Sequence, residues 1–529
     1  MTFAAALGGT YAAWHYHRLG LTLSHYDARG HLVVARRIAD SITPGWQQIG
    51  AVWLPLPHLL NAIPVQADRV YRTGASGVAI SIASYAMAAG AITSILLMLT
   101  ESVFAAIAGV VVFALNPNVL YLQSTPMTEP LLLATTTLAV AMLMASLRRL
   151  PGQHTAHPQA VEVSAPVDSP HILSQSFEQR AAPISWFDHL TTSDRGVGIV
   201  FALACLTRYE AWPVTVAALA AAAWARWRRG QPVPAVARGI AGIAVYPALT
   251  VAAFAIFSRV VIGEWFVSGG FFVPENKALG DPVMAAAEIG WGARMLSGAP
   301  LTWVGAAGLA IALGFGLGSR RRAEMLIAVA LPAMAAIPWT AFLNGHPFRI
   351  RYMVPLIAVE AIGAGVAAGV LPGRRLRAAC ASALLVLAAY ELRPLDASAP
   401  MVVEAQWDRP NAPVRARVTA CLGRPSRGEK IMASMGSLGH YMQEASASGF
   451  AIRDFLHEGN GDIWLAALNG PRPFVQWVLI EEKAEGGDML AHIARERPSF
   501  LAGYERMCEG AGLALYRRGI RDEGLGIRD

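Results

Sequence analysis

The amino-acid sequence predicts a mainly α-helical, polytopic membrane protein: a transmembrane helical bundle of about eleven helices, followed by a soluble C-terminal α/β domain. Hydrophobic residues make up 54% of the 529 residues and charged residues only 15%, whereas soluble proteins carry about a quarter charged residues. Apolar stretches of about 15 to 24 residues recur through residues 1–392, and most are long enough to cross a bilayer. In residues 393–529 short β-like runs alternate with Gly-rich turns, which indicates a separate domain.

The candidate membrane spans are the apolar runs themselves. They cover residues 2–15, 76–98, 102–121, 129–147, 196–208, 211–225, 239–262, 300–318, 324–342, 353–371 and 378–392. The first run, and the two that flank Arg208, are shorter than a typical span of about 20 residues. The predicted helix count depends on these three runs.

Arginine clusters predict how the spans are oriented. When the helices are counted alternately, the clusters at residues 148–149, 226–229, 319–322 and 374–377 fall on one side. The positive-inside bias assigns that side to the cytoplasm, so we expect a cytoplasmic N-terminus and an extracytoplasmic C-terminal domain. The same bias explains the formal net charge of +7, and we expect no nucleic-acid partner.

Two long polar segments separate the spans. Residues 15–73 form the first outer loop, whose helical middle and Trp/Pro-rich end are typical of helices that lie in the membrane interface. Residues 151–193 form a Pro/His/Gln/Ser-rich cytoplasmic segment, and its composition is typical of a disordered linker. We expect no chemistry in this linker.

The C-terminal domain carries two β-like runs and two cysteines. Residues 474–480 and 513–517 are predicted strands. If this domain is extracytoplasmic, Cys421 and Cys508 can pair as a disulfide, because such compartments are oxidising.

Ionisable residues outside the arginine clusters gather on the expected outer side. Because such residues are costly within a membrane, their grouping predicts a reaction site there. Asp27 follows the first apolar run and is the candidate general base, a carboxylate that can take a proton from an acceptor hydroxyl. The alternative is that Asp27 only caps the helix that follows. His25 and His31 lie nearby, but their spacing does not support a zinc site, and we expect no cofactor.

Glu129 is the candidate second catalytic carboxylate, although the helix dipole alone also favours a glutamate in a first turn. Arg208 and Glu210 interrupt an apolar stretch. They mark either a helix hairpin at the interface or, for Arg208, a cation that holds a lipid phosphate. His58 and Trp53 in the first outer loop, together with Glu210, are candidates for contact with a donor head group or an acceptor.

The motif Arg349-Ile350-Arg351-Tyr352 precedes a late span on the expected outer side. Positive-inside topology does not explain two arginines there. Arginine binds phosphate oxygens through two parallel hydrogen bonds. Arg349 and Arg351, with Tyr352, are therefore the candidates for binding the phosphate of a donor.

Together these motifs resemble the C-type (polytopic, lipid-donor) glycosyltransferase superfamily, near the bacterial protein-mannosyltransferase and aminoarabinose-transferase branch. The resemblance covers about residues 1–390 and is carried by Asp27, Pro55-Leu56-Pro57-His58, Glu129 and Arg349-Ile350-Arg351-Tyr352. It implies a multi-pass enzyme of the bacterial inner membrane, a polyprenyl-phosphate-linked sugar as donor, and inverting transfer with the first-loop aspartate as base. Members of that branch carry Asp-Glu in this loop, whereas here alanine follows the aspartate. The hydroxyl acceptor, whether protein, lipid or glycan, therefore stays open.

Two other functions stay open from the sequence. A polyprenyl-linked polysaccharide polymerase or ligase uses paired arginines in outer loops and needs no first-loop aspartate. A transporter or lipid flippase is the other, but transporters tend to show two related halves, and no such repeat is visible in this sequence.

Overall fold

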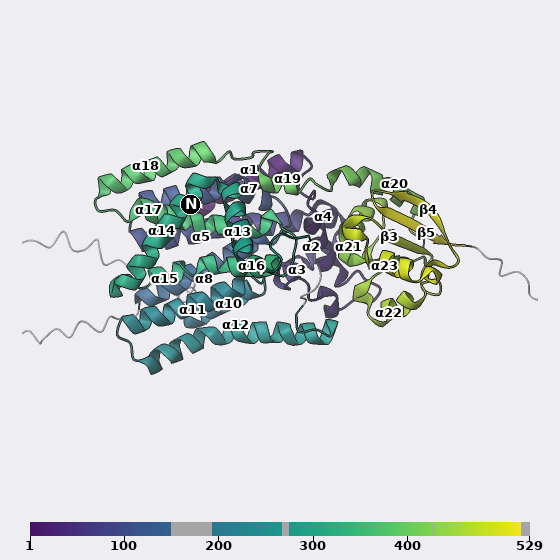
Figure 1. The fold of residues 1–529 in the computed structure, drawn as a ribbon, viewed down its shortest axis with the longest axis horizontal. Coiled ribbons are helices and arrows are strands. Elements are labelled where there is room, and N and C mark those ends of the chain that lie inside the picture. The colour runs from purple at the N-terminus through teal and green to yellow at the C-terminus, as the bar shows by residue number, and fades with distance from the viewer. Residues whose placement is uncertain (150–192, 267–274, 427, 520–529) are drawn as a thin grey trace, which may run out of the picture.

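The computed structural model describes residues 1–149, 193–266, 275–426 and 428–519. Figure 1 shows a bundle of roughly parallel helices, with a smaller α/β domain attached at one end. Apart from Ser193, the expected linker at residues 151–193 lies outside the described residues. The predicted fold class, a transmembrane-type helical bundle with a C-terminal α/β domain, is confirmed.

Six helical segments of the described chain are long and apolar enough to cross a membrane: Ala75–Thr100, Glu129–Arg148, Val233–Ile262, Ala299–Gly318, Met325–Leu343 and Ile350–Gly369. The helices of the bundle are α1 (Thr2–Arg18), α5 (Ala75–Thr100), α6 (Val103–Ala114), α7 (Pro117–Leu122), α8 (Glu129–Arg149), α10 (Asp194–Cys205), α11 (Ala211–Arg228), α12 (Val233–Ile262), α13 (Pro282–Ser297), α14 (Ala299–Gly318), α15 (Met325–Ala328), α16 (Ala336–Leu343), α17 (Leu356–Gly369) and α18 (Arg374–Glu391). The count of eleven spans stays a prediction.

Two apolar runs differ from the expectation of one straight helix each. The run at 102–121 breaks between α6 and α7, where the Asn116 side chain accepts a hydrogen bond from the Asn118 N–H and Pro117 opens the next helix. The run at 324–342 is divided into α15, the 3₁₀ turn η4 (Leu331–Ala335) and α16. Helix α13 was not predicted, because no continuous apolar run marks it.

The four arginine clusters meet at one end of the bundle. Arg148 and Arg229 both form ion pairs with the buried Glu324. Arg228 donates to the carbonyl of Leu317, and Arg377 donates to the carbonyl of Thr100. Figure 1 places this end opposite the α/β domain. The expected common side is therefore observed, while its assignment to the cytoplasm stays a prediction.

Helices α14 and α17 pack through glycines in the middle of the bundle. A Cβ atom added to Gly308 would overlap the carbonyl of Gly363, and one added to Gly363 would overlap the carbonyl of Gly305. Small residues let two helix backbones approach closely, and van der Waals contact then stabilises the pair in lipid.

Replacing Gly308 by leucine should therefore separate α14 from α17. We expect a loss of about 1–3 kcal/mol or more in unfolding free energy, because the added side chain overpacks a backbone contact. The thermal midpoint of the purified protein in detergent measures it. Gly314→Leu on the same helix is the matched control, because a Cβ atom there meets nothing within 4 Å. Equal midpoints for the two variants would contradict this packing argument.

The C-terminal domain is built on a five-stranded sheet in the order β2-β1-β3-β5-β4. Strands β1 (Ile431–Ala433), β2 (Phe455–Leu456) and β3 (Trp477–Glu481) are parallel to one another. Strand β5 (Leu513–Arg518) pairs antiparallel with β3 on one side and with β4 (Tyr504–Gly510) on the other. Its helices are α20 (Ala412–Leu422), α21 (Met435–Ala445), α22 (Asp462–Asn469) and α23 (Met489–Glu496). Both predicted strands are present, as β3 and β5.

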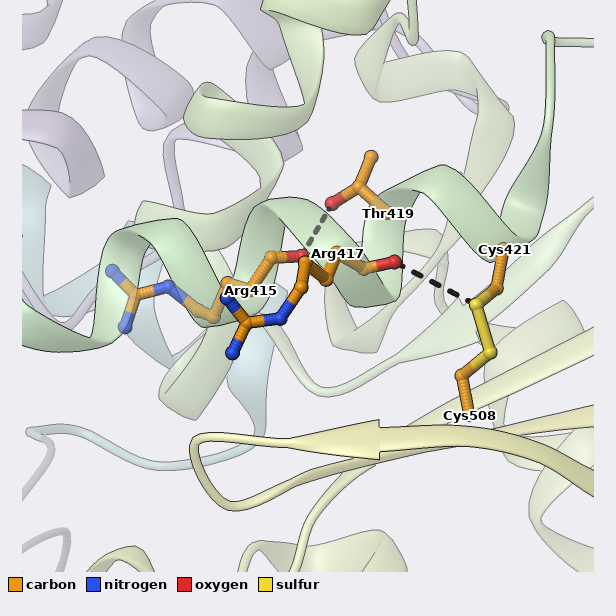
Figure 2. The surroundings of a disulfide bond; sticks show 5 residues. All are labelled: Arg415, Arg417, Thr419, Cys421 and Cys508. Atoms are coloured by element: carbon orange, nitrogen blue, oxygen red, sulfur yellow. Dashed lines mark hydrogen bonds between the residues drawn. A yellow bond between two sulfur atoms is a disulfide. The ribbon is translucent and has the colours of Figure 1, made fainter.

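A disulfide joins Cys421 at the end of α20 to Cys508 on β4, with the two Cα atoms 6.5 Å apart (Figure 2). The bond fixes α20 against the edge of the sheet. In the preceding turn of α20, the Thr419 hydroxyl donates to the carbonyl of Arg415. The pairing that the sequence left conditional is thus formed.

The first outer loop packs into the C-terminal domain. The loop contains α2 (Tyr26–Arg37), η1 (Trp46–Ile49), α3 (Leu56–Asn61), η2 (Pro64–Gln66) and α4 (Asp68–Thr73). Leu32 and Tyr71 from the loop share one buried hydrophobic cluster with Leu438, Tyr441 and Phe455 from the domain. The loop and the domain therefore share one core, and the proposed boundary at residue 392 stays a prediction.

Candidate active site where the bundle meets the C-terminal domain

The N-terminus of α2 presents Asp27 at the end of the bundle. His25 is the N-cap of this helix, because its Nδ1 atom accepts a hydrogen bond from the Asp27 N–H at 3.1 Å. The alternative interpretation of Asp27 as the cap is therefore wrong. Its carboxylate is buried and instead forms an ion pair with Arg351.

Arg351 comes from the 3₁₀ turn η5 (Ile350–Met353), which leads into α17. Its guanidinium carbon lies 5.1 Å from the centre of the Tyr352 ring. Its buried Nε–H has no hydrogen-bond acceptor among the described residues. Arg349 faces a different neighbour, with its guanidinium 5.9 Å from the ring centre of Trp407. The two arginines thus contact different aromatic rings.

Glu404 is a site residue that the sequence reasoning missed. It ends the short helix α19 (Pro400–Glu404), which follows the last helix of the bundle. Its Oε2 atom accepts a hydrogen bond from the Ile350 N–H at 3.0 Å, and its Oε1 atom lies 3.7 Å from His25 Nε2. The available signal was a lone carboxylate among the apolar residues of the segment Met-Val-Val-Glu-Ala.

A second ion-pair cluster surrounds Arg208, in the turn between α10 and α11. Its Nη1 atom lies 2.9 Å from Glu129 Oε1, and its Nη2 atom lies 2.7 Å from Glu210 Oε1. The same Nη1 atom donates to the Thr128 hydroxyl at 3.0 Å. The fully buried Glu129 is thus more than a favourable first-turn residue, because it neutralises a buried arginine.

The first outer loop contributes an aromatic cluster. His31 Nδ1 lies 3.1 Å from His58 Nε2, and the ring centre of Trp53 lies 4.2 Å from that of His31. A Cβ atom added to Gly30 would meet the Trp53 ring at 2.9 Å, so the helix passes close to the indole. Within the described residues, no group of three or more His, Cys, Asp or Glu side chains is arranged to hold a metal ion.

No protein-family model matches the chain, and a search of curated proteins finds no match. Two solved structures of ArnT from Cupriavidus metallidurans resemble the chain over 97% of its length at 12% sequence identity. The crystal structure bound to undecaprenyl phosphate has a TM-score of 0.53 and is matched over 97% of its own chain. The apo structure has a TM-score of 0.48, with 98% of its chain matched.

The chain has the ArnT fold. This likeness confirms, at the level of the fold, the resemblance to the aminoarabinose-transferase branch. The fold brings together candidate residues that are far apart in the sequence: Asp27 meets Arg351, and Glu129 meets Arg208 and Glu210. His58 and Trp53 form a neighbouring cluster within the first outer loop.

An ion-pair network holds this first outer loop of the ArnT-like fold against the C-terminal domain. Arg29, on the same helix as Asp27, pairs with Glu444 of α21, and Glu444 also pairs with Arg415 of α20. Asp40, at the end of the loop helix, accepts from both Arg36 and Arg453. The orientation of α2 therefore depends on the C-terminal domain.

Four buried histidines (His25, His31, His58 and His457) and the half-buried His440 should make the fold acid-sensitive. Burial lowers the pKa of His25 to about 4 and those of His58 and His440 to about 3, and it lowers the pKa values of His31 and His457 as well. An unfolded histidine titrates near 6.5. As the pH falls from about 6.5 toward 4, the unfolded chain therefore binds protons that the folded chain does not.

We expect the unfolding free energy to be highest above about pH 6.5. Below it, each histidine still neutral in the fold should cost up to about 1.4 kcal/mol per pH unit. Asp488, whose pKa burial raises to about 6, and Glu288, whose pKa burial also raises, act in the opposite direction but are outnumbered by the histidines. The thermal midpoint between pH 7.5 and 5 measures the slope. His440→Gln should flatten it more than His492→Gln, an exposed control; a midpoint constant across this range would contradict the account.

Proposed function

We propose that the chain is an inverting glycosyltransferase that moves a sugar from a polyprenyl-phosphate donor to an acceptor hydroxyl at the outer face of the bacterial inner membrane. The observation that carries this proposal is the buried Asp27–Arg351 pair at the domain-bearing end of the bundle. It pairs a potential base with a potential phosphate ligand. The ArnT fold supports the donor class, because a structure with this fold contains undecaprenyl phosphate.

In the proposed reaction, Asp27 accepts the proton of the acceptor hydroxyl. The oxygen of that hydroxyl attacks the anomeric carbon of the donor sugar. The bond between that carbon and the phosphate oxygen breaks, and the lipid phosphate leaves with the electron pair. Attack from the opposite side inverts the anomeric centre. Arg351 stabilises the charge on the departing phosphate, and an arriving phosphate competes with Asp27 for this guanidinium, which frees the carboxylate to act as base.

Arg349 and Tyr352 are proposed as further ligands of the donor phosphate. Arg208 is a weaker candidate, because Glu129 and Glu210 already balance its charge. We propose that Arg208, Glu129 and Glu210, a trio joined by ion pairs, border the donor site. We also propose that His58 and Trp53 contact the sugar or the acceptor. The disulfide between Cys421 and Cys508 supports an extracytoplasmic C-terminal domain, since disulfides persist in oxidising compartments.

Binding of the donor class can be tested without knowing the sugar. The purified protein in nanodiscs is titrated with undecaprenyl phosphate while its thermal midpoint is followed. A ligand at about 100 times its Kd stabilises a fold by about 2.7 kcal/mol, so we expect a clear increase. Undecaprenol, which lacks the phosphate, and phosphatidic acid, which lacks the polyprenyl chain, should give smaller increases.

The matched variants are Arg349→Ala and Arg69→Ala. Arg349 is next to the site, whereas Arg69 is an exposed arginine of the first outer loop. The increase with undecaprenyl phosphate should shrink in the first variant and persist in the second. An equal increase with undecaprenol would contradict a phosphate-bearing donor.

A further inference from the structure

We propose that Glu404 is a positioning residue that holds the two halves of the site, the α2 N-terminus with Asp27 and the η5 turn with Arg351, in one geometry. This inference rests on the proposed function and deepens it. Glu404 belongs neither to the bundle helices nor to the sheet of the C-terminal domain, but to the segment that connects them. It reaches both halves from that third position.

The two oxygens of the Glu404 carboxylate serve different partners. Oε2 accepts from the Ile350 backbone N–H at 3.0 Å, which fixes the start of the turn that carries Arg351. Oε1 lies 3.7 Å from His25 Nε2. Glu404 Oε1 and His25 Nε2 are both buried, and neither atom has a hydrogen-bond partner among the described residues. The carboxylate is therefore directed at both partners at once.

The His25 ring transmits this contact to Asp27. Because Nδ1 accepts the Asp27 N–H, the ring must carry its proton on Nε2, the nitrogen that lies 3.7 Å from Glu404 Oε1. Burial lowers the pKa of His25 to about 4, so the ring is neutral at physiological pH. Carboxylate, imidazole and backbone N–H thus form a chain with one consistent set of donors and acceptors.

Glu404 must remain ionised to present an acceptor oxygen to both the Ile350 N–H and the His25 ring. Burial alone would raise its pKa, but the contact with His25 and the nearby Arg351 outweigh burial, and the pKa is lowered. A glutamine could accept from only one partner, because its amide nitrogen is a donor. If the amide nitrogen faced His25, it would oppose the Nε2–H of the ring. If it faced Ile350, it would oppose the backbone N–H. Either arrangement loosens one half of the site.

The test compares Glu404→Gln with His25→Asn and with the control Glu481→Gln, in donor-saturated transfer assays. Asparagine can still cap α2 but cannot reach Glu404. Glu481 is a buried carboxylate of the C-terminal sheet that, like Glu404, accepts from the backbone, here from the N–H groups of Lys483 and Ala484. We expect Glu404→Gln and His25→Asn each to lower kcat by about 10²-fold, as misplaced catalytic groups do. Glu481→Gln should leave kcat unchanged.

A double-mutant cycle separates positioning from a merely structural role. If Glu404 acts through His25, the double variant should be no slower than either single variant. In the Asp27→Asn background, adding Glu404→Gln should not lower the residual rate any further. The inference is overturned if the reductions in kcat multiply in the His25→Asn or the Asp27→Asn background. It is also overturned if a folded Glu404→Gln protein keeps an unchanged kcat. Wild-type turnover by Asp27→Asn would instead refute the proposed function, and the inference with it.

Discussion

Replacing Asp27 by asparagine should lower sugar transfer by roughly 10²–10⁴-fold, the range in which general bases contribute to catalysis. Asparagine keeps the size of the side chain but cannot accept the proton of an acceptor hydroxyl. It also leaves Arg351 without its anionic partner, so the donor phosphate should still bind. Initial rates with a polyprenyl-phosphate sugar, at saturating donor, measure the loss.

The matched control for this variant is Asp408→Asn. Asp408 is also paired with an arginine, since Arg415 contacts its carboxylate at 2.7 Å, but it lies in the network of the C-terminal domain. The Asp408→Asn substitution should lower the thermal midpoint without a comparable loss of kcat. If Asp27→Asn stayed active while Arg349→Ala did not, the polymerase or ligase alternative would be favoured, because that class needs no first-loop aspartate.

Replacing Arg208 by methionine should destabilise the protein by about 3–5 kcal/mol, the typical cost of removing one partner from a buried ion pair. The substitution leaves Glu129 and Glu210 as two buried carboxylates without a cation. A lower thermal midpoint in detergent, together with reduced yield from membranes, should report this loss.

The same account predicts a rescue. Adding Glu129→Gln and Glu210→Gln to the Arg208→Met protein removes the unpaired charges and should restore much of the midpoint, although not the transfer rate. Arg69→Met, an exposed arginine of the first outer loop, is the matched control and should cost less than about 0.5 kcal/mol. Similar midpoints for the Arg208 and Arg69 variants would show that the trio does not stabilise the fold.

Part of the candidate site was predictable because the signals were local. Asp27 stands out as a charged residue of the loop that follows the first apolar run, and Arg351 stands out as a charged residue just before the run at 353–371. Glu404 does not stand out in this way, since a single glutamate in a connecting segment has many possible roles. The sequence also did not indicate His25 as the cap of α2, because aspartate is a preferred N-cap residue and histidine is not among them.

The sequence by itself determined the membrane character, the α/β tail and the shared side of the arginine clusters, because hydropathy and charge are properties of short segments and add along the chain. Only the tertiary structure decided which charges meet. Asp27 meets Arg351, Arg208 meets Glu129 and Glu404 meets Ile350 from segments far apart in the chain. These contacts depend on how the helices, the first outer loop and the C-terminal domain pack together. A buried charge needs a partner, but its own neighbourhood in the sequence does not specify which one.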